Sequence, residues 1–190
     1  MEKEISEKQN ILIHSCCGPC STTAIFELGE NYNITVCYYN PNIYPEEEYI
    51  KRKSEQIKLI NQINSEGNIK INVLDADYDP ENYEKLVENL RNEKEGGARC
   101  SVCFEMRLSK VAFLAKTNGF DLFATTLTVS PHKNAKLINE IGEKVAKTYG
   151  ISYLPTDFKK KDGYKKSIEY SKQYDLYRQR YCGCRYSIWF

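Results

Sequence analysis

Seven of the eight cysteines in this 190-residue chain fall into three short clusters. Two thiolates a few positions apart, at a turn that enters a helix, can bind one metal ion or neighbouring irons of a cluster. Four thiolates are enough for one iron–sulfur cluster or one structural zinc, so seven indicate a cluster with a second metal or with a redox-active pair. The clusters are Cys16, Cys17 and Cys20; Cys100 and Cys103; and Cys182 and Cys184.

Three simpler interpretations of these cysteines stay open at this point. Four of them could hold a structural zinc, two could form a catalytic or redox-sensing disulfide, or all could be buried side chains. The polar segment 1–10 lacks an apolar stretch, which predicts no secretory signal and a cytoplasmic location. Structural disulfides are rare there. Cys37 stands apart in an apolar run, and we expect it to be a small buried side chain.

The composition is that of a globular domain with a packed core. Apolar residues make up 41% and charged residues 28%, with few glycines and prolines, which excludes disordered and fibrous classes. The mean hydropathy of −0.60 and the lack of a long apolar run exclude a membrane-spanning protein. The length predicts a single α/β domain over 1–190.

Apolar runs separated by turn signals predict the elements that must position the cysteines. Strands are expected at 11–14, 34–39, 69–74, 122–127 and 152–154, and helices at 21–28, 46–63, 80–92, 100–117, 134–149 and 164–180. Such alternation predicts a mostly parallel sheet in a three-layer α/β sandwich, followed by a short cysteine-containing tail. Ligands of such sheets bind beyond the carboxyl ends of the strands, where the first cysteine cluster follows the first strand.

Other polar side chains follow the predicted strands at the same edge. His14, His132 and Asp75 are candidate acids, although His14 could equally be a hydrogen-bonded buried histidine and Asp75 part of turn chemistry. Side chains that could bind a polar substrate are Asn40, Asn42, Thr125, Thr126 and Ser130. Threonine is also common in strands because of its β-propensity.

Charge is distributed unevenly along the chain. Residues 1–98 hold 10 Lys/Arg and 18 Asp/Glu, whereas residues 99–190 hold 17 and 8. A basic half suggests a polyanionic partner, or a solvated basic face. Tyr170, Tyr174, Tyr177 and Tyr181 have helical spacing beside Arg178, which suits base stacking with phosphate contacts. For the tyrosines alone, an amphipathic stripe packed on the sheet is the better interpretation.

The chain lacks the GxxxxGK[ST], GxGxxG and GxSxG patterns, which argues against an ATP- or NAD-dependent enzyme on a standard loop. Five other segments stand out: ILIHSCCGPC at 11–20, NPNI at 40–43, RCSVCFEMR at 99–107, TTL and SPHK between 125 and 133, and YRQRYCGC at 177–184. In this order, and from 11 to 187, they together resemble the epoxyqueuosine reductases of the QueH type.

The resemblance implies an adenine nucleotide alpha hydrolase-like (HUP-like) fold, a 4Fe–4S cluster and a nearby additional metal ion, expected to be iron. It implies reduction of epoxyqueuosine to queuosine at the tRNA wobble position. Its partners would be the tRNA anticodon loop and a low-potential electron donor such as ferredoxin or flavodoxin. The protein would be a monomer with no membrane association. Tyr177 and Arg178 would bind substrate. The ligands would be the motif cysteines; the family position of Cys20 can be Asp, which favours a role at the second metal. Which of the other thiolates binds which metal stays open.

Three rival functions make different predictions. A cluster-dependent tRNA sulfur-transfer enzyme needs an SGGxDS-like loop after the first strand, where this chain has HSCCGPCS. A zinc-stabilised nucleic-acid-binding module predicts one tetrahedral zinc. A thiol–disulfide redox protein predicts no metal.

Overall fold

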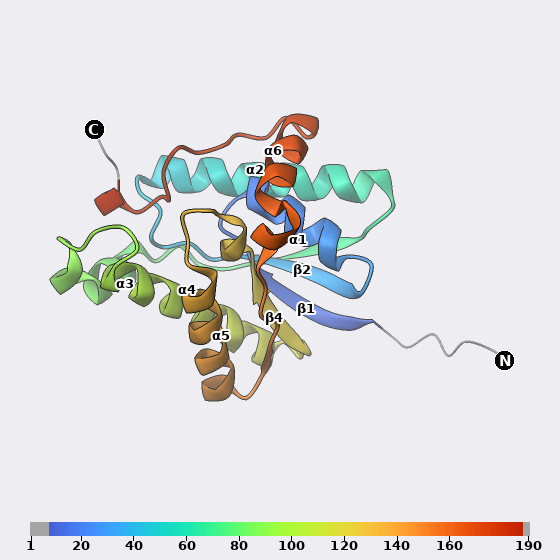
Figure 1. The fold of residues 1–190 in the computed structure, drawn as a ribbon. Coiled ribbons are helices and arrows are strands. Elements are labelled where there is room, and N and C mark those ends of the chain that lie inside the picture. Colours follow the sequence, from blue (N-terminus) through green and yellow to red (C-terminus); the bar gives the residue numbers. More distant parts are fainter. Residues whose placement is uncertain (1–7, 188–190) are drawn as a thin grey trace.

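The structure, a computed structural model, describes residues 8–187, without the side chain of Lys161. Within that range, five strands form one parallel sheet in the order β3-β2-β1-β4-β5 (Figure 1). In the central strand, Ile11 lies opposite Ile34 on one side and Leu122 on the other. The strands are β1 (Gln9–His14), β2 (Tyr32–Tyr38), β3 (Ile71–Asp75), β4 (Leu122–Thr125) and β5 (Ser152–Tyr153).

Helices cover both faces of the sheet, which confirms the predicted three-layer α/β sandwich (Figure 1). On one face lie α1 (Gly18–Leu28), α2 (Glu46–Glu66) and α6 (Gly163–Gln173). On the other lie α4 (Ala98–Thr117) and α5 (Ala135–Tyr149), with α3 (Pro80–Leu86) against α4. No helix among residues 8–187 has the length and apolarity that a membrane crossing requires.

The two core layers follow from the alternation of side chains along β1. Ile11 and Ile13 pack with Ile25 of α1 and Leu59 of α2. Leu12 points to the opposite face, into the layer of α4 and α5 that also buries Cys37. Successive side chains of a strand point to opposite faces, so a central parallel strand is apolar throughout. The expectation that Cys37 is a small buried side chain is confirmed, because its exposed fraction is 0%.

Three predicted elements are shorter than the sequence suggests. The helix expected over 164–180 is wrong beyond Gln173, because Asp175 adopts a left-handed φ of 47° and the Leu176 amide bonds back to the Ser171 carbonyl. The strand expected to 127 ends at Thr125, whose hydroxyl caps the 3-10 helix η2 (Thr126–Val129). The helix expected over 80–92 is divided into α3 and η1 (Glu88–Leu90).

The consequence is largest in the tail, residues 174–187. Instead of continuing α6, this segment runs back past α2 toward α3 (Figure 1). The Arg52 guanidinium donates to the Tyr181 and Cys182 carbonyls at 3.3 and 3.2 Å, and the Tyr44 amide donates to the Gly183 carbonyl at 2.8 Å. Gly183 has a φ of +108° and lies against Ile43, so a side chain there would be both strained and crowded. These contacts bring the tail cysteines to α4.

Candidate metal centre

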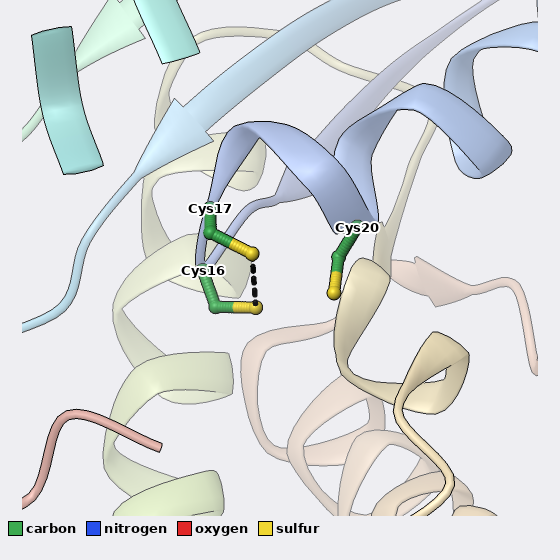
Figure 2. Close-up of side chains that lie close together, drawn as sticks. All are labelled: Cys16, Cys17 and Cys20. Carbon is green, nitrogen blue, oxygen red and sulfur yellow. Dashed lines mark hydrogen bonds between the residues drawn. The ribbon is translucent and has the colours of Figure 1, made fainter. Parts of the chain in front are cut away.

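The first candidate metal-binding group, the three-cysteine group, consists of Cys16, Cys17 and Cys20 at the turn from β1 into α1. Their sulfur atoms all lie within 4.8 Å of one another, and Cys16 Sγ is 3.9 Å from Cys17 Sγ. Figure 2 shows the three thiols pointing toward a shared space from the start of the helix. Cys17 precedes the first residue of α1 in an extended conformation and makes no capping bond, so its thiol remains available. The positive end of a helix dipole favours thiolates.

Hydrogen bonds couple the three thiols, and their pKa values shift in opposite directions. The hydrogen bonds with Cys17 and Cys20 lower the pKa of Cys16 well below its usual value. The same bonds to Cys16 raise the pKa of Cys17 to about 11 and that of Cys20 well above its usual value. A bound metal ion replaces those protons, because cysteine ligates as the thiolate.

The second group, the four-cysteine group, combines two distant parts of the chain. Cys100 and Cys103 lie on the first turns of α4, and Cys182 and Cys184 come from the tail. All four line one cavity of about 40 Å³. Burial raises the pKa of Cys103 to about 12 and also raises that of Cys100 and Cys184. Four thiols around one buried cavity match the donor set of an iron–sulfur cluster or a structural zinc.

Neighbouring groups hold individual sulfur atoms through hydrogen bonds. The Gly96 amide donates to Cys100 Sγ at 3.1 Å, and the Tyr83 hydroxyl lies 3.1 Å from Cys184 Sγ. The Gln179 side-chain amide donates to Cys17 Sγ at 3.1 Å. Partners of this kind orient metal ligands and are nearly as important as the ligands themselves. The sequence alone assigned these residues no role, since nothing in their spacing points to a sulfur atom.

A cleft of about 850 Å³ connects the two groups. Cys16, Cys20 and Cys182 line it, together with Ser130 and His132. His132 also lines the four-cysteine cavity, so this predicted acid lies between the two groups. The structure therefore brings all three cysteine clusters to the carboxyl edge of the sheet, beside the switch point where β2 and β4 flank β1.

His14, by contrast, is enclosed behind the cysteines. Its Nδ1 lies 3.0 Å from the Thr125 hydroxyl, and its Nε2 lies 3.1 Å from the Tyr39 carbonyl and 3.2 Å from Arg107 Nε. Burial and the Arg107 charge lower the pKa of His14 to about 3, so its imidazole is neutral at pH 7. The geometry matches the alternative interpretation of a hydrogen-bonded buried histidine. Asn40 belongs to the same network and donates to the Ser15 carbonyl at 2.8 Å.

Two other predicted polar residues do face the cysteines. Thr126 Oγ1 lies 3.8 Å from Cys16 Sγ. Asn42 is buried, lines the four-cysteine cavity, and has no hydrogen-bond partner for its Oδ1 among the described residues. An unpaired buried amide oxygen is costly, which makes Asn42 a candidate contact for a group bound in that cavity.

Asp75 and Tyr177 lie away from both cavities. The Asp75 carboxylate is 2.7 Å from Lys53 Nζ, and its side chain is 63% exposed. The Tyr177 hydroxyl donates to Glu48, and Lys51 Nζ lies 3.6 Å from the centre of its ring. Neither residue is among those that line the cleft or the four-cysteine cavity.

Other aromatic and basic residues border the cleft instead. Tyr164 is 40% exposed and faces the Arg178 guanidinium at 5.7 Å. Arg178 is held by the Ser167 carbonyl and the Ser171 hydroxyl, each at 3.0 Å, and lines the cleft as predicted for a substrate contact. Burial by itself lowers the pKa of Lys133, but the interaction with nearby cysteines, Cys16 most of all, raises that pKa above the usual value.

The tyrosine stripe is divided by the end of α6. Tyr170 stacks on Phe26 with ring centres 4.6 Å apart, and Tyr174 is 4% exposed beside the same ring. For these two, packing in the core is confirmed. Tyr181 lies on the tail and lines the cleft, so the four tyrosines do not form one helical face.

The fold and these two groups define a class of α/β protein in which cysteine thiols gather in candidate metal sites at the carboxyl edge of a parallel sheet. A profile described as "Epoxyqueuosine reductase QueH" matches residues 11–189. The chain belongs to the epoxyqueuosine reductase QueH family, which confirms the resemblance seen in the sequence.

Three relatives illustrate the extent of this similarity, and each is named Epoxyqueuosine reductase QueH. The protein of Streptococcus pyogenes serotype M1 is 46% identical over 186 residues, which cover 98% of this chain and 72% of the relative. That of Staphylococcus epidermidis is 44% identical over 180 residues, 94% of this chain and 76% of the relative. That of Thermotoga maritima is 34% identical over 181 residues, covering 94% and 90%.

Proposed function

We propose that this chain reduces epoxyqueuosine to queuosine at the wobble position of tRNA. The observation that carries the proposal is the convergence of three distant segments, which together carry seven cysteines, on one cleft and the cavity beside it. Family membership supplies the substrate. In the reaction both C–O bonds of the epoxide break, a carbon–carbon double bond forms, and the oxygen leaves as water. The balance requires two electrons and two protons.

The two cysteine groups divide the metals between them in this proposal. The four-cysteine group supplies the four thiolates of a 4Fe–4S cluster, and Cys16, Cys17 and Cys20 bind the additional metal ion, iron, beside the cleft. The donors fit, because four thiols share one buried cavity and three others lie within 4.8 Å of one another. When bound, the cluster supplies electrons one at a time and the second ion acts as a Lewis acid toward the epoxide oxygen.

The residues of the cleft bind the tRNA. Tyr164 offers an exposed aromatic face for stacking, while Arg178 and Arg180 place positive charge where phosphates would lie. The modified base has to leave the anticodon stack, at a small cost because the loop is single-stranded. Of the polar residues predicted to bind substrate, Thr126 faces Cys16, Ser130 lines the cleft and Asn42 lines the four-cysteine cavity. Asn40, Thr125 and His14 position the strand ends behind them.

Proton delivery falls to His132 in this scheme. Of the candidates His14, His132 and Asp75, His132 is the one that lines the cleft. His14 has no proton to give as an imidazolium at neutral pH, and Asp75 is paired with Lys53 at the surface. A low-potential one-electron donor, a ferredoxin or flavodoxin, supplies the electrons to the monomer in the cytoplasm.

The test begins with protein purified without oxygen. Iron, zinc and acid-labile sulfide are measured with the visible spectrum, and the protein is then incubated with epoxyqueuosine-containing tRNA and a chemical reductant. Iron with matching sulfide, and conversion to queuosine detected by mass spectrometry of the nucleosides, supports the proposal. One zinc without sulfide and no conversion overturns it in favour of a nucleic-acid-binding module. A nucleoside that gains the mass of sulfur instead would indicate a sulfur-transfer enzyme.

A further inference from the structure

Arg107 is a buried cation whose hydrogen-bond partners are all neutral. It lies on α4 one turn after Cys103, and its exposed fraction is 3%. Its Nε donates to His14 Nε2 at 3.2 Å, and its Nη2 donates to Asn40 Oδ1. Among residues 8–187 no carboxylate lies within 4.0 Å of this guanidinium. A guanidinium stays charged at any physiological pH, so the fold buries a full positive charge here.

Two other buried arginines show how this protein usually satisfies such a charge. Arg52, which is 2% exposed, has the Glu48 carboxylate 2.7 Å from its Nε. Arg99, which is 1% exposed, donates to the Leu90 and Arg91 carbonyls at 3.2 and 3.0 Å. Arg107 has neither a carboxylate nor a set of backbone carbonyls. A buried charge whose contacts are all neutral is costly, and a neighbouring anion would offset that cost.

The four-cysteine group is the neighbour that can become that anion. Arg107 Nη1 lies 3.9 Å from Cys103 Sγ, and Arg107 lines the same cavity as the four thiols. Metal binding removes the thiol protons. Four thiolates then outnumber the positive charges of an oxidised 4Fe–4S cluster or of a zinc ion, leaving the site negative.

We infer that Arg107 is the counter-charge of the four-cysteine group, stabilising its metal-loaded form and favouring its reduction. Because each electron added to a cluster adds negative charge, a fixed cation beside Cys103 raises the reduction potential. Arg107 acts through the ligands and is therefore a positioning residue. The inference rests on the proposed function in one respect, since it requires a metal or cluster at this group.

The first experiment measures the midpoint potential in anaerobic, cluster-loaded protein. Arg107→Met removes the charge, and we expect a tenfold lower equilibrium constant for reduction, which is about 59 mV more negative for a one-electron couple. Arg107→Lys keeps the charge while losing the planar fork, and we expect a potential close to that of the unchanged protein. Equal potentials in the Met variant and the unchanged protein overturn the inference. So does a Lys variant that shifts as far as the Met variant.

The second experiment compares unfolding by urea in the metal-free and loaded forms. We expect Arg107→Met to lose more stability in the loaded form, with about tenfold weaker retention of metal against a chelator. Leu108→Ala is the control, since Leu108 is fully buried next along α4 and its loss should cost both forms equally. An Arg107→Met loss that is also equal in both forms overturns the inference. If the Met variant does not fold, Arg107→Gln provides the uncharged side chain.

The two proposals can fail separately. An unchanged protein that loads a cluster and converts epoxyqueuosine, with a potential insensitive to Arg107→Met, refutes the counter-charge alone. A protein that binds zinc refutes the reductase, yet four thiolates around zinc are still anionic. The comparison of metal-free and loaded stability then still decides whether Arg107 balances that charge.

Discussion

The three-cysteine and four-cysteine groups lie at the same edge of the sheet but are assembled differently. Cys16, Cys17 and Cys20 belong to one turn, so the exit of β1 and the start of α1 are enough to place them. The four-cysteine group forms only after the tail has docked onto α4 and α3. A local site depends on local backbone geometry, whereas a non-local site makes metal binding part of tertiary folding.

Their environments differ as well. Cys16 and Cys20 line the cleft of about 850 Å³, whereas the four-cysteine group surrounds the smaller cavity of about 40 Å³, has Arg107 on its wall and reaches the cleft through Cys182. A small cavity lined by thiols suits a group that passes electrons, and a wide cleft suits an ion that touches substrate.

The largest effect is expected from deleting a ligand in each group. Cys184→Ser should remove most iron and all sulfide, whereas Cys20→Ser should leave the sulfide and lose about one metal equivalent. Both should lower turnover by more than about 100-fold, since even outer hydrogen-bond partners of metal ligands are worth up to that factor. Metal and sulfide analysis of the two variants, beside activity on epoxyqueuosine-containing tRNA, makes the comparison. Equal sulfide loss in both variants would show that the groups form one site.

Gln179→Leu should weaken the three-cysteine group selectively. The Gln179 amide donates to Cys17 Sγ at 3.1 Å, and its loss should reduce metal affinity there by about 10- to 100-fold. The affinity can be measured by competition with a chelator, using the absorption of bound Co²⁺. Gln179→Glu is the matched variant, because it keeps the shape but places a negative charge beside the thiolate and should bind less metal still. Unchanged affinity in both variants would remove Gln179 from the metal site.

Tyr83→Phe is the corresponding change at the four-cysteine group, with an expected effect of similar size. The buried Tyr83 hydroxyl lies 3.1 Å from Cys184 Sγ, and burial raises its pKa, so it remains protonated and donates to the thiolate. Loss of a hydrogen bond to a charged group costs about 1.5–3 kcal/mol, so metal retention should fall by roughly tenfold or more. Timed release to a chelator measures it. Metal loss from the three-cysteine group instead would contradict the assignment.

Much of the fold was predictable because its signals are local. The apolar run of β1 and the three glutamates that begin α2 are features that periodicity and helix-end rules detect. The end of α6 was not predictable, because the tyrosine spacing continues as in a helix while Asp175 turns the chain. A helix continues only where its side chains find packing partners. Beyond Gln173 the chain packs against α2 instead, so the helix ends there although the tyrosine spacing continues.

The candidate site shows the same contrast between residues with a local sequence signal and residues that only tertiary contacts place. The cysteines were recognisable from their residue type and spacing alone. No sequence signal pointed to the residues that contact their sulfur atoms. Gln179 and Tyr83 each reach a cysteine that is far away in the sequence. Arg107 faces inward from a helix, as any core residue does. Asp75 is a candidate acid in the sequence because it follows a predicted strand. However, β3 is the edge strand of the sheet, so its end lies away from the switch point between β1 and β4.

Asp75→Asn therefore gives the smallest expected effect and is the control variant for the other substitutions. The substitution removes the charge that pairs with Lys53, and a surface pair of this kind contributes about 0–1 kcal/mol to stability. Asp75 lines neither the cleft nor the four-cysteine cavity. Surface substitutions of this kind have small effects, so we expect kcat/KM, metal content and sulfide content to stay within about twofold of the unchanged protein. His132→Asn, measured in the same assay, is the matched change at a residue that does line the cleft, and it should lower kcat with the metals retained. If Asp75→Asn lowers kcat as far as His132→Asn does, the proton path runs along β3, and the two cysteine groups alone do not define the active site.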